Sequence, residues 1–123
     1  MRKKILIIED NEQNLYLITF IFKKHGYEVE SASDGQTGID MALRIKPDLI
    51  VLDIQLPVMD GYAVARRLRS YPDLADIPIV AVTSYAMVGD REKAFESGCT
   101  GYIEKPINPE TFMAQVEEHF LEK

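Results

Sequence analysis

Short apolar runs alternate along the chain with longer amphipathic stretches. Each run has the length of a buried strand, whereas the stretches between the runs carry apolar residues at helical spacing. The apolar runs predict strands at residues 4–8, 49–52, 79–82 and 102–103, and an alternation of apolar and polar residues predicts an edge strand at residues 27–31. It predicts helices at residues 12–25, 35–45, 58–69, 87–97 and from 108 onward, the last with Phe112, Val116 and Phe120 on its apolar face.

This alternation of strand and helix is repeated through the whole chain. Serial βα units form a parallel sheet through right-handed crossovers, which place helices on both faces of the sheet. We therefore predict an α/β fold of the flavodoxin-like, doubly wound type, with a five-stranded parallel sheet in the order 2-1-3-4-5 and five helices. No linker or repeat divides the sequence, so a single domain spanning residues 1–123 is expected.

Composition and charge exclude several classes of function. Of the 123 residues, 46% are apolar and 28% are charged, as in ordinary globular domains. The net charge of −6 argues against nucleic-acid binding, because phosphate contacts require clustered lysine and arginine. No segment approaches the roughly 20 apolar residues that a membrane helix needs. The single cysteine, Cys99, fits a reducing cytoplasm, and we expect it to be a small buried residue.

Three carboxylates follow predicted strands that are neighbours in this sheet. Glu9 and Asp10 end the first strand, and Asp53 ends the third. At the point where the strand order reverses, such residues share one pocket. Like charges held this close repel one another unless a cation neutralises them, and oxygen ligands suit Mg²⁺. The alternative is that the three are ordinary solvated acids at strand ends. Because they lie at the ends of adjacent strands, a metal site is the better interpretation.

Two further strand ends carry groups that complement these acids. Thr83 follows the fourth predicted strand, and Lys105 follows the fifth. Taken singly, Thr83 suits a strand-end cap and Lys105 a surface position. Together with a metal and a carboxylate, a hydroxyl and an ammonium provide the groups needed for phosphoryl transfer. In that chemistry Asp53 is the nucleophile, and Thr83 and Lys105 bind the phosphoryl oxygens.

With these residues in place, the sequence resembles the receiver domain of two-component response regulators. The resemblance covers essentially the whole chain and depends on the order and spacing of several short motifs. They are Glu9-Asp10, Asp53, Pro57, Met59-Asp60-Gly61, Thr83, Tyr102 and Lys105-Pro106. The segments at residues 53–57 and 83–87 are similar to those of DivK-like, single-domain cell-cycle regulators.

The resemblance implies a phosphorylation site and its ligands. Asp53 is expected to accept phosphate from a phosphohistidine on a histidine kinase or a histidine phosphotransfer protein. Asp10, Asp53 and the main-chain carbonyl of Gln55 are expected to bind Mg²⁺, with Glu9 acting through water. The Lys105-Pro106 peptide bond matches one that is cis in the family.

The resemblance also implies a switch and residues that tune it. Thr83 is expected to turn toward the phosphoryl group and Tyr102 to move inward, which changes the surface of the last two βα units and selects a downstream protein. Gln55 and Tyr85 match positions that tune the lifetime of the phosphate. The alternative is that these two residues are ordinary members of the pocket rim.

The first predicted helix carries more apolar residues than one buried face requires. Its stripe toward the sheet is predicted to be Leu17, Ile18 and Ile21, with Phe22 at the border. The other side then carries Leu15, Tyr16 and Phe20, an aromatic patch that we expect to be a docking surface for the phosphodonor. The alternative is a helix rotated slightly from this assignment, with the three residues partly buried.

Three rival functions fit the sequence less well. A haloacid-dehalogenase phosphatase needs an acid two residues after its nucleophile, and Gln55 cannot serve as one. A flavodoxin-like flavin binder needs a phosphate loop after its first strand, where residues 9–12 are acidic. A scaffold that signals without phosphate requires a broken site, and no key group is missing.

We therefore expect a stand-alone receiver that catalyses its own phosphorylation and dephosphorylation and is not a turnover enzyme. It would switch protein–protein interactions or relay phosphate in the cytoplasm. A fragment of a hybrid histidine kinase is the alternative, which the start at Met1 and the complete last helix disfavour.

Overall fold

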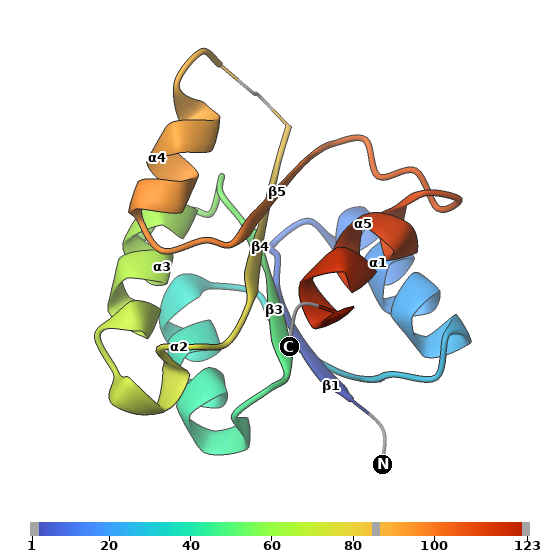
Figure 1. The fold of residues 1–123 in the computed structure, drawn as a ribbon, viewed down its shortest axis with the longest axis horizontal. Helices are drawn as coiled ribbons and strands as arrows, with labels where there is room; N and C mark the ends of the chain where they lie inside the picture. Colours follow the sequence, from blue (N-terminus) through green and yellow to red (C-terminus); the bar gives the residue numbers. More distant parts are fainter. Residues whose placement is uncertain (1–2, 85–86, 122–123) are drawn as a thin grey trace.

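Five parallel strands form one sheet in the order β2-β1-β3-β4-β5 (Figure 1). The structure is a computed structural model that describes residues 3–84 and 87–121, with side chains described through residue 118. The strands are β1 (Lys4–Ile8), β2 (Glu28–Ala32), β3 (Leu49–Asp53), β4 (Ile79–Thr83) and β5 (Gly101–Glu104). This arrangement confirms the predicted α/β fold and strand order.

Helices cover both faces of the sheet. They are α1 (Glu12–Lys24), α2 (Gly35–Ile45), α3 (Gly61–Arg69), α4 (Asp90–Glu96) and α5 (Phe112–Leu121), with a short 3₁₀ helix η1 (Pro72–Leu74). Figure 1 shows α1 and α5 on one face and α2, α3 and α4 on the other. Among the described residues, no helix is long and apolar enough to span a membrane.

The central strands are apolar because both of their faces are buried. Alternate residues of β1 enter different cores: Leu6 and Ile8 pack with α2 and α3, whereas Ile5 and Ile7 pack with α1 and α5. A strand covered on both faces reads as a continuous apolar run instead of an alternating one. The edge strand β2 is mostly exposed, as its alternating sequence predicts.

Strand register brings the functional residues to one edge of the sheet. Ile8 lies opposite Leu52, and Asp53 lies opposite Val82. The ladder also extends past the strand ends, because the N–H of Glu9 donates to the carbonyl of Ala32 at 3.0 Å. Residues that follow β1, β3, β4 and β5 therefore share the carboxyl edge, where ligands bind in open α/β sheets.

Two helices begin later than the sequence pattern predicts. The helix expected from residue 58 begins at Gly61, because Val58 has a φ of 67° and the Asp60 side chain accepts a hydrogen bond from the N–H of Ala63. The helix expected from residue 87 begins at Asp90, after Gly89 with a φ of 93°. In both segments apolar residues continue the helical spacing into a loop, so apolar spacing alone cannot locate the helix start.

The last helix also begins later than predicted. Residues 108–111 form a turn in which the carbonyl of Asn108 accepts from the N–H groups of Thr111 and Phe112, and α5 begins at Phe112. Phe112 and Val116 lie in the core as expected, and the side chain of Phe120 lies outside the described residues. The second strand is shifted by one residue, to Glu28–Ala32.

Gly61 allows α3 to pack directly against the end of β3. A Cβ atom at this position would lie 2.6 Å from the carbonyl oxygen of Asp53 and 2.6 Å from Cα of Ile54. No side chain fits at that distance, so glycine is required for this close approach. The contact places the start of α3 directly against the main chain at Asp53 and Ile54.

Candidate functional site

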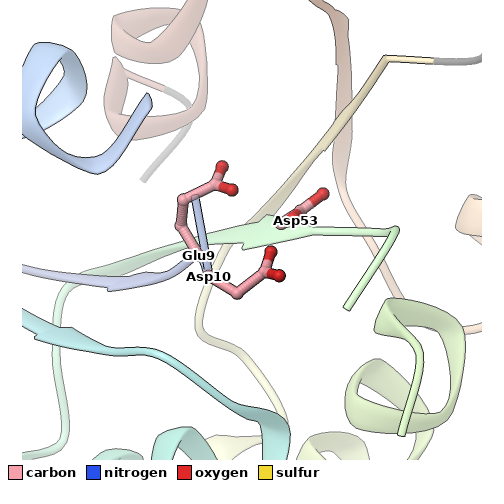
Figure 2. Close-up of side chains that lie close together, drawn as sticks. All are labelled: Glu9, Asp10 and Asp53. Carbon is pink, nitrogen blue, oxygen red and sulfur yellow. The ribbon is translucent and has the colours of Figure 1, made fainter. Parts of the chain in front are cut away.

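Glu9, Asp10 and Asp53 form an acidic cluster at the ends of β1 and β3. One carboxylate oxygen from each residue lies within 4.8 Å of the other two. Figure 2 shows the three side chains gathered at this edge of the sheet. The predicted convergence of these residues is therefore present in the structure.

Burial of two of the three carboxylates disfavours their ionised forms. Glu9 is 2% exposed and Asp53 is 3% exposed, whereas Asp10 lies on the exposed side of the cluster. Burial, followed by the negative charge of Asp53, raises the pKa of Glu9 to about 7. Removal from water and a like charge both disfavour the ionised carboxylate. The site therefore favours a cation.

Lys105 supplies one positive charge to this site. Its Nζ atom lies 3.1 Å from Oε1 of Glu9 and 3.5 Å from Oδ1 of Asp53, and its side chain is nearly buried. The N–H of Lys105 donates to the carbonyl of Thr83 at 2.8 Å, which fixes the residue beside β4. The Lys105-Pro106 peptide bond is cis, the conformation that the family resemblance implies. One ammonium between two buried carboxylates offsets only part of their charge.

The donor set fits a hard divalent cation. The three carboxylates present oxygen atoms only, and an exposed Asp10 leaves the cluster open to solvent on one side. Mg²⁺ prefers oxygen ligands, keeps several waters and binds through one or two carboxylates plus phosphate. Three carboxylates and one ammonium leave an excess of negative charge that such a cation would neutralise.

Gln55 connects the end of β3 with the end of β4. Its main-chain N–H donates to Oδ1 of Asp53 at 3.0 Å. Its side-chain Nε2 donates to the hydroxyl of Thr83 at 2.5 Å, and its Oε1 accepts from the N–H of Ser84 at 3.0 Å. One residue is thus bonded to the acidic cluster and to the strand that carries Thr83.

The two predicted switch residues lie on neighbouring strands. Thr83 ends β4 and is buried, and Tyr102 lies on β5, where its partner in the register is Ala81. The hydroxyl of Tyr102 is buried and has no hydrogen-bond partner among the described residues. Its ring lies 5.9 Å from the guanidinium carbon of Arg91 on α4. A buried hydroxyl without a partner is unusual, because most buried polar groups are hydrogen-bonded.

The α1 patch is exposed only in part. Tyr16 is 74% exposed and Phe20 is 54% exposed, whereas Leu15 is half-buried and packs against the core. Phe22, predicted at the border, is fully buried and makes an edge-to-face contact with Phe112. The helix is therefore rotated slightly from the predicted assignment, and two aromatic side chains remain at the surface.

Sequence reasoning missed two contacts and could not place one residue. Neither the hydrogen bond from Gln55 to Thr83 nor the double ion pair of Lys105 follows from spacing, because both depend on side-chain rotamers across different strands. Tyr85, predicted to tune phosphate lifetime, lies outside the described residues. Cys99 is buried as expected, and burial raises the pKa of its thiol to about 11.

Comparison with known proteins gives a consistent result. The family model for the response regulator receiver domain matches residues 5–117. The chain is 39% identical to the polar-differentiation response regulator DivK of Brucella anthropi, over 97% of both chains.

Solved structures with the same fold include two instructive neighbours. The chemotaxis response regulator CheY4 of Vibrio cholerae aligns with a TM-score of 0.91 at 27% identity, covering 97% of this chain and 99% of that one. The receiver domain of a sensor histidine kinase from Pseudomonas aeruginosa, solved with a magnesium ion in its active-site cleft, aligns with a TM-score of 0.88 at 32% identity, covering 96% and 97%. The chain therefore belongs to the response regulator receiver domain family of two-component signalling, whose members are phosphorylated on aspartate and bind Mg²⁺.

Proposed function

We propose that Asp53 accepts a phosphoryl group from a phosphohistidine in a Mg²⁺-dependent reaction. The observation that carries this proposal is the position of its carboxylate, which is buried in a cluster with Glu9 and Asp10 and lies 3.5 Å from the ammonium of Lys105. A buried carboxylate with both a cation-binding cluster and a fixed ammonium beside it can meet an anionic phosphoryl group without prohibitive repulsion.

The transfer is a displacement at phosphorus. A carboxylate oxygen of Asp53 forms the new O–P bond while the P–N bond to the donor imidazole breaks, and the imidazole nitrogen keeps the electron pair and takes up a proton. Asp10, Asp53 and the main-chain carbonyl of Gln55 would hold Mg²⁺, with Glu9 acting through a water molecule. When bound, the ion would offset the charge of the cluster and of the incoming phosphoryl oxygens.

Lys105 and Thr83 complete the phosphoryl site. Lys105 already contacts Oδ1 of Asp53 and would bind a phosphoryl oxygen by a short movement of its ammonium. Thr83 would donate its hydroxyl proton to another phosphoryl oxygen. The ammonium of Lys105 is placed before reaction, whereas Thr83 would turn toward the phosphoryl group.

Gln55 and Tyr85 are proposed to tune the lifetime of the phosphate, because either side chain could orient or exclude the attacking water. We expect Gln55→Ala and Tyr85→Ala to change the rate of autodephosphorylation, measured as decay of the phosphorylated protein. Unchanged decay in both variants would refute this role.

The exposed aromatic side chains of α1 are proposed to dock the phosphodonor. Tyr16 and Phe20 are the exposed pair, and Leu15 forms the edge of the patch. The double variant Tyr16→Ala/Phe20→Ala should slow transfer from a phosphohistidine donor while phosphorylation by acetyl phosphate is preserved. Equal losses with both donors would show that the patch is not a docking surface.

The last two βα units are proposed to carry the output, through binding of a downstream protein or onward transfer of phosphate. Arg91, Phe95 and Tyr102 line a hollow of about 250 Å³ on this face, and the guanidinium of Arg91 lies 5.2 Å from the Phe95 ring centroid. Inward movement of Tyr102 would change the shape of this hollow.

We propose that the protein acts as a stand-alone receiver in the cytoplasm.

The test is incubation with acetyl phosphate, with and without Mg²⁺, followed by intact mass measurement. We expect one phosphoryl adduct on the wild type with Mg²⁺, and none without the ion or on Asp53→Asn. An adduct on Asp53→Asn would move the acceptor to another residue, and the absence of any adduct on the wild type would refute the proposed function.

A further inference from the structure

The side chain of Gln55 makes two hydrogen bonds that neither metal binding nor phosphoryl transfer requires. It donates to the hydroxyl of Thr83 at 2.5 Å and accepts from the N–H of Ser84 at 3.0 Å. The metal site would use only the main-chain carbonyl of this residue. The side chain is therefore hydrogen-bonded to the last residue of β4 and to the first residue of the connection from β4 to α4.

The orientation of the amide follows from this pair of contacts. The N–H of Ser84 can only donate, so it must face the carbonyl oxygen of the amide. The amide NH₂ then faces the hydroxyl of Thr83, which must act as an acceptor there. Since a hydroxyl carries one proton, the proton of Thr83 is directed away from Gln55.

The proposed response to phosphorylation would move Thr83, which is hydrogen-bonded to Gln55. If Thr83 turns toward a phosphoryl group on Asp53, its oxygen changes position relative to Gln55, whose main-chain N–H is bonded to Asp53. The contact between Nε2 and the Thr83 hydroxyl is then stretched or broken. The unphosphorylated arrangement is thus stabilised by a bond that the phosphorylated one would not keep.

We propose that Gln55 is a positioning residue that holds Thr83 and Ser84 in the unphosphorylated arrangement and so sets how readily the switch responds. This inference rests on the proposed function of Asp53 and goes beyond a role in water access. A net hydrogen bond between neutral groups changes an equilibrium by about two- to tenfold. Gln55→Ala should favour the responding arrangement by that factor, while the main-chain carbonyl and N–H remain in place.

The first experiment uses metal-free protein without any phosphodonor. Scalar couplings to the Thr83 methyl carbon report its χ1 rotamer, and hydrogen exchange reports protection of the Ser84 amide. We expect one rotamer and a protected amide in the wild type, and rotamer averaging with faster exchange in Gln55→Ala. Gln55→Glu, which retains an acceptor for Ser84, should preserve the amide protection. Identical rotamer populations and exchange rates in wild type and Gln55→Ala would overturn the proposal.

The second experiment locates the effect on Thr83. Beryllofluoride with Mg²⁺ imitates the phosphoryl group, and its apparent affinity is measured for wild type, Gln55→Ala, Thr83→Val and the double variant. We expect Gln55→Ala to tighten binding about two- to tenfold in the wild-type background and to have a smaller effect beside Thr83→Val, where only the contact with Ser84 is left to lose. An equal effect in both backgrounds would overturn the proposal, since Gln55 would then act on the phosphoryl group or water directly.

The two experiments separate this inference from the proposed function. If wild-type protein binds neither beryllofluoride nor a phosphoryl group, the proposed function fails. The metal-free measurements still decide whether Gln55 holds Thr83 and Ser84. If the wild type binds beryllofluoride and Gln55→Ala behaves identically, only the present inference fails.

Discussion

Two halves of the carboxyl edge of the sheet are built differently. The acidic half comprises the ends of β1 and β3 with Glu9, Asp10 and Asp53, and it follows strands that are buried on both faces. The switch half comprises the connection from β4 to α4 and the strand β5, with Thr83 and Tyr102. The acidic half follows two buried strands, whereas the switch half includes the half-buried Tyr102 and exposed residues that precede α4.

The described residues of the switch half next to α4 lie at the surface, where Met87 and Val88 are exposed. Helix α4 has only seven residues, and its N-cap Gly89 makes no side-chain hydrogen bond. The carboxylate of Asp90 accepts from the N–H of Met87 at 2.8 Å. At the other end of the connection, the side-chain oxygen of Gln55 accepts from the N–H of Ser84. The comparison teaches that the reacting carboxylates lie at the ends of buried strands, whereas the described part of the β4–α4 connection lies near the surface and is joined to its neighbours by polar contacts.

The largest effect is expected from removing the ammonium in the acidic half. Lys105→Ala should slow phosphorylation by acetyl phosphate about 100-fold, because loss of one preorganised group that stabilises developing charge costs about 10²–10³ in rate. Rates are measured by intact mass over time. The control is Lys46→Ala, which removes an exposed lysine paired with Asp73. Similar rates in Lys105→Ala and wild type would mean that this ammonium takes no part in transfer.

An effect of the same size and a smaller one are expected on Mg²⁺ affinity. Asp10→Asn removes a proposed direct ligand and should weaken Mg²⁺ binding by about 100-fold, whereas Glu9→Gln, acting through water, should weaken it by about tenfold. Isothermal titration calorimetry measures both affinities. A larger loss in Glu9→Gln than in Asp10→Asn would reverse the proposed assignment of direct and water-mediated ligands.

Thr83→Val is expected to separate the two halves. Phosphorylation should persist with a rate within about tenfold of wild type, because one donor to the phosphoryl group is lost. The ring resonances of Tyr102 should no longer shift on phosphorylation, since the movement of Thr83 toward the phosphoryl group is absent. Thr111→Val, at an exposed position after β5, is the control. A normal Tyr102 shift in Thr83→Val would show that the switch does not run through this hydroxyl.

Cys99 provides the mildest probe, because it reports opening of the switch half without any substitution. The thiol follows α4, is 4% exposed, and has its pKa raised to about 11 by burial. Since the thiolate is the reactive form, alkylation by iodoacetamide should be slow at pH 8 and should accelerate as the pH approaches 11. The sign follows from burial, which favours the neutral thiol in the folded state. Alkylation at pH 8 as fast as in denatured protein would show that the region around Cys99 is open.

The fold was predictable from the sequence because its signals are repeated. Four apolar runs, one alternating segment and five amphipathic stretches each specify an element, and the doubly wound topology then brings Glu9, Asp10 and Asp53 together. Helix starts were less predictable, since Val58 and Met87 continue the helical spacing although Val58 has a positive φ and Met87 precedes Gly89.

Contacts between side chains from different strands were not predictable. The grip of Gln55 on Thr83 and the double ion pair of Lys105 depend on rotamers and on exact strand register. The buried face of α1 was assigned with a small rotational error. Leu17, Ile18 and Ile21 were enough to form an apolar stripe in the sequence, so Phe22 was placed at its border, whereas Phe22 is fully buried. Sequence therefore located the groups of the site, and the structure supplied their partners.

The central claim is that the acidic half binds Mg²⁺ and the phosphoryl group, and that the switch half changes its arrangement in response to the phosphoryl group. The most direct measurement is a two-step NMR titration of backbone amides, first with Mg²⁺ and then with beryllofluoride. We predict that Mg²⁺ alone shifts resonances around Asp10, Asp53 and Gln55, and that beryllofluoride adds large shifts at Thr83, along α4 and at Tyr102. Large shifts throughout the switch half with Mg²⁺ alone, or beryllofluoride shifts confined to the acidic half, would contradict this account.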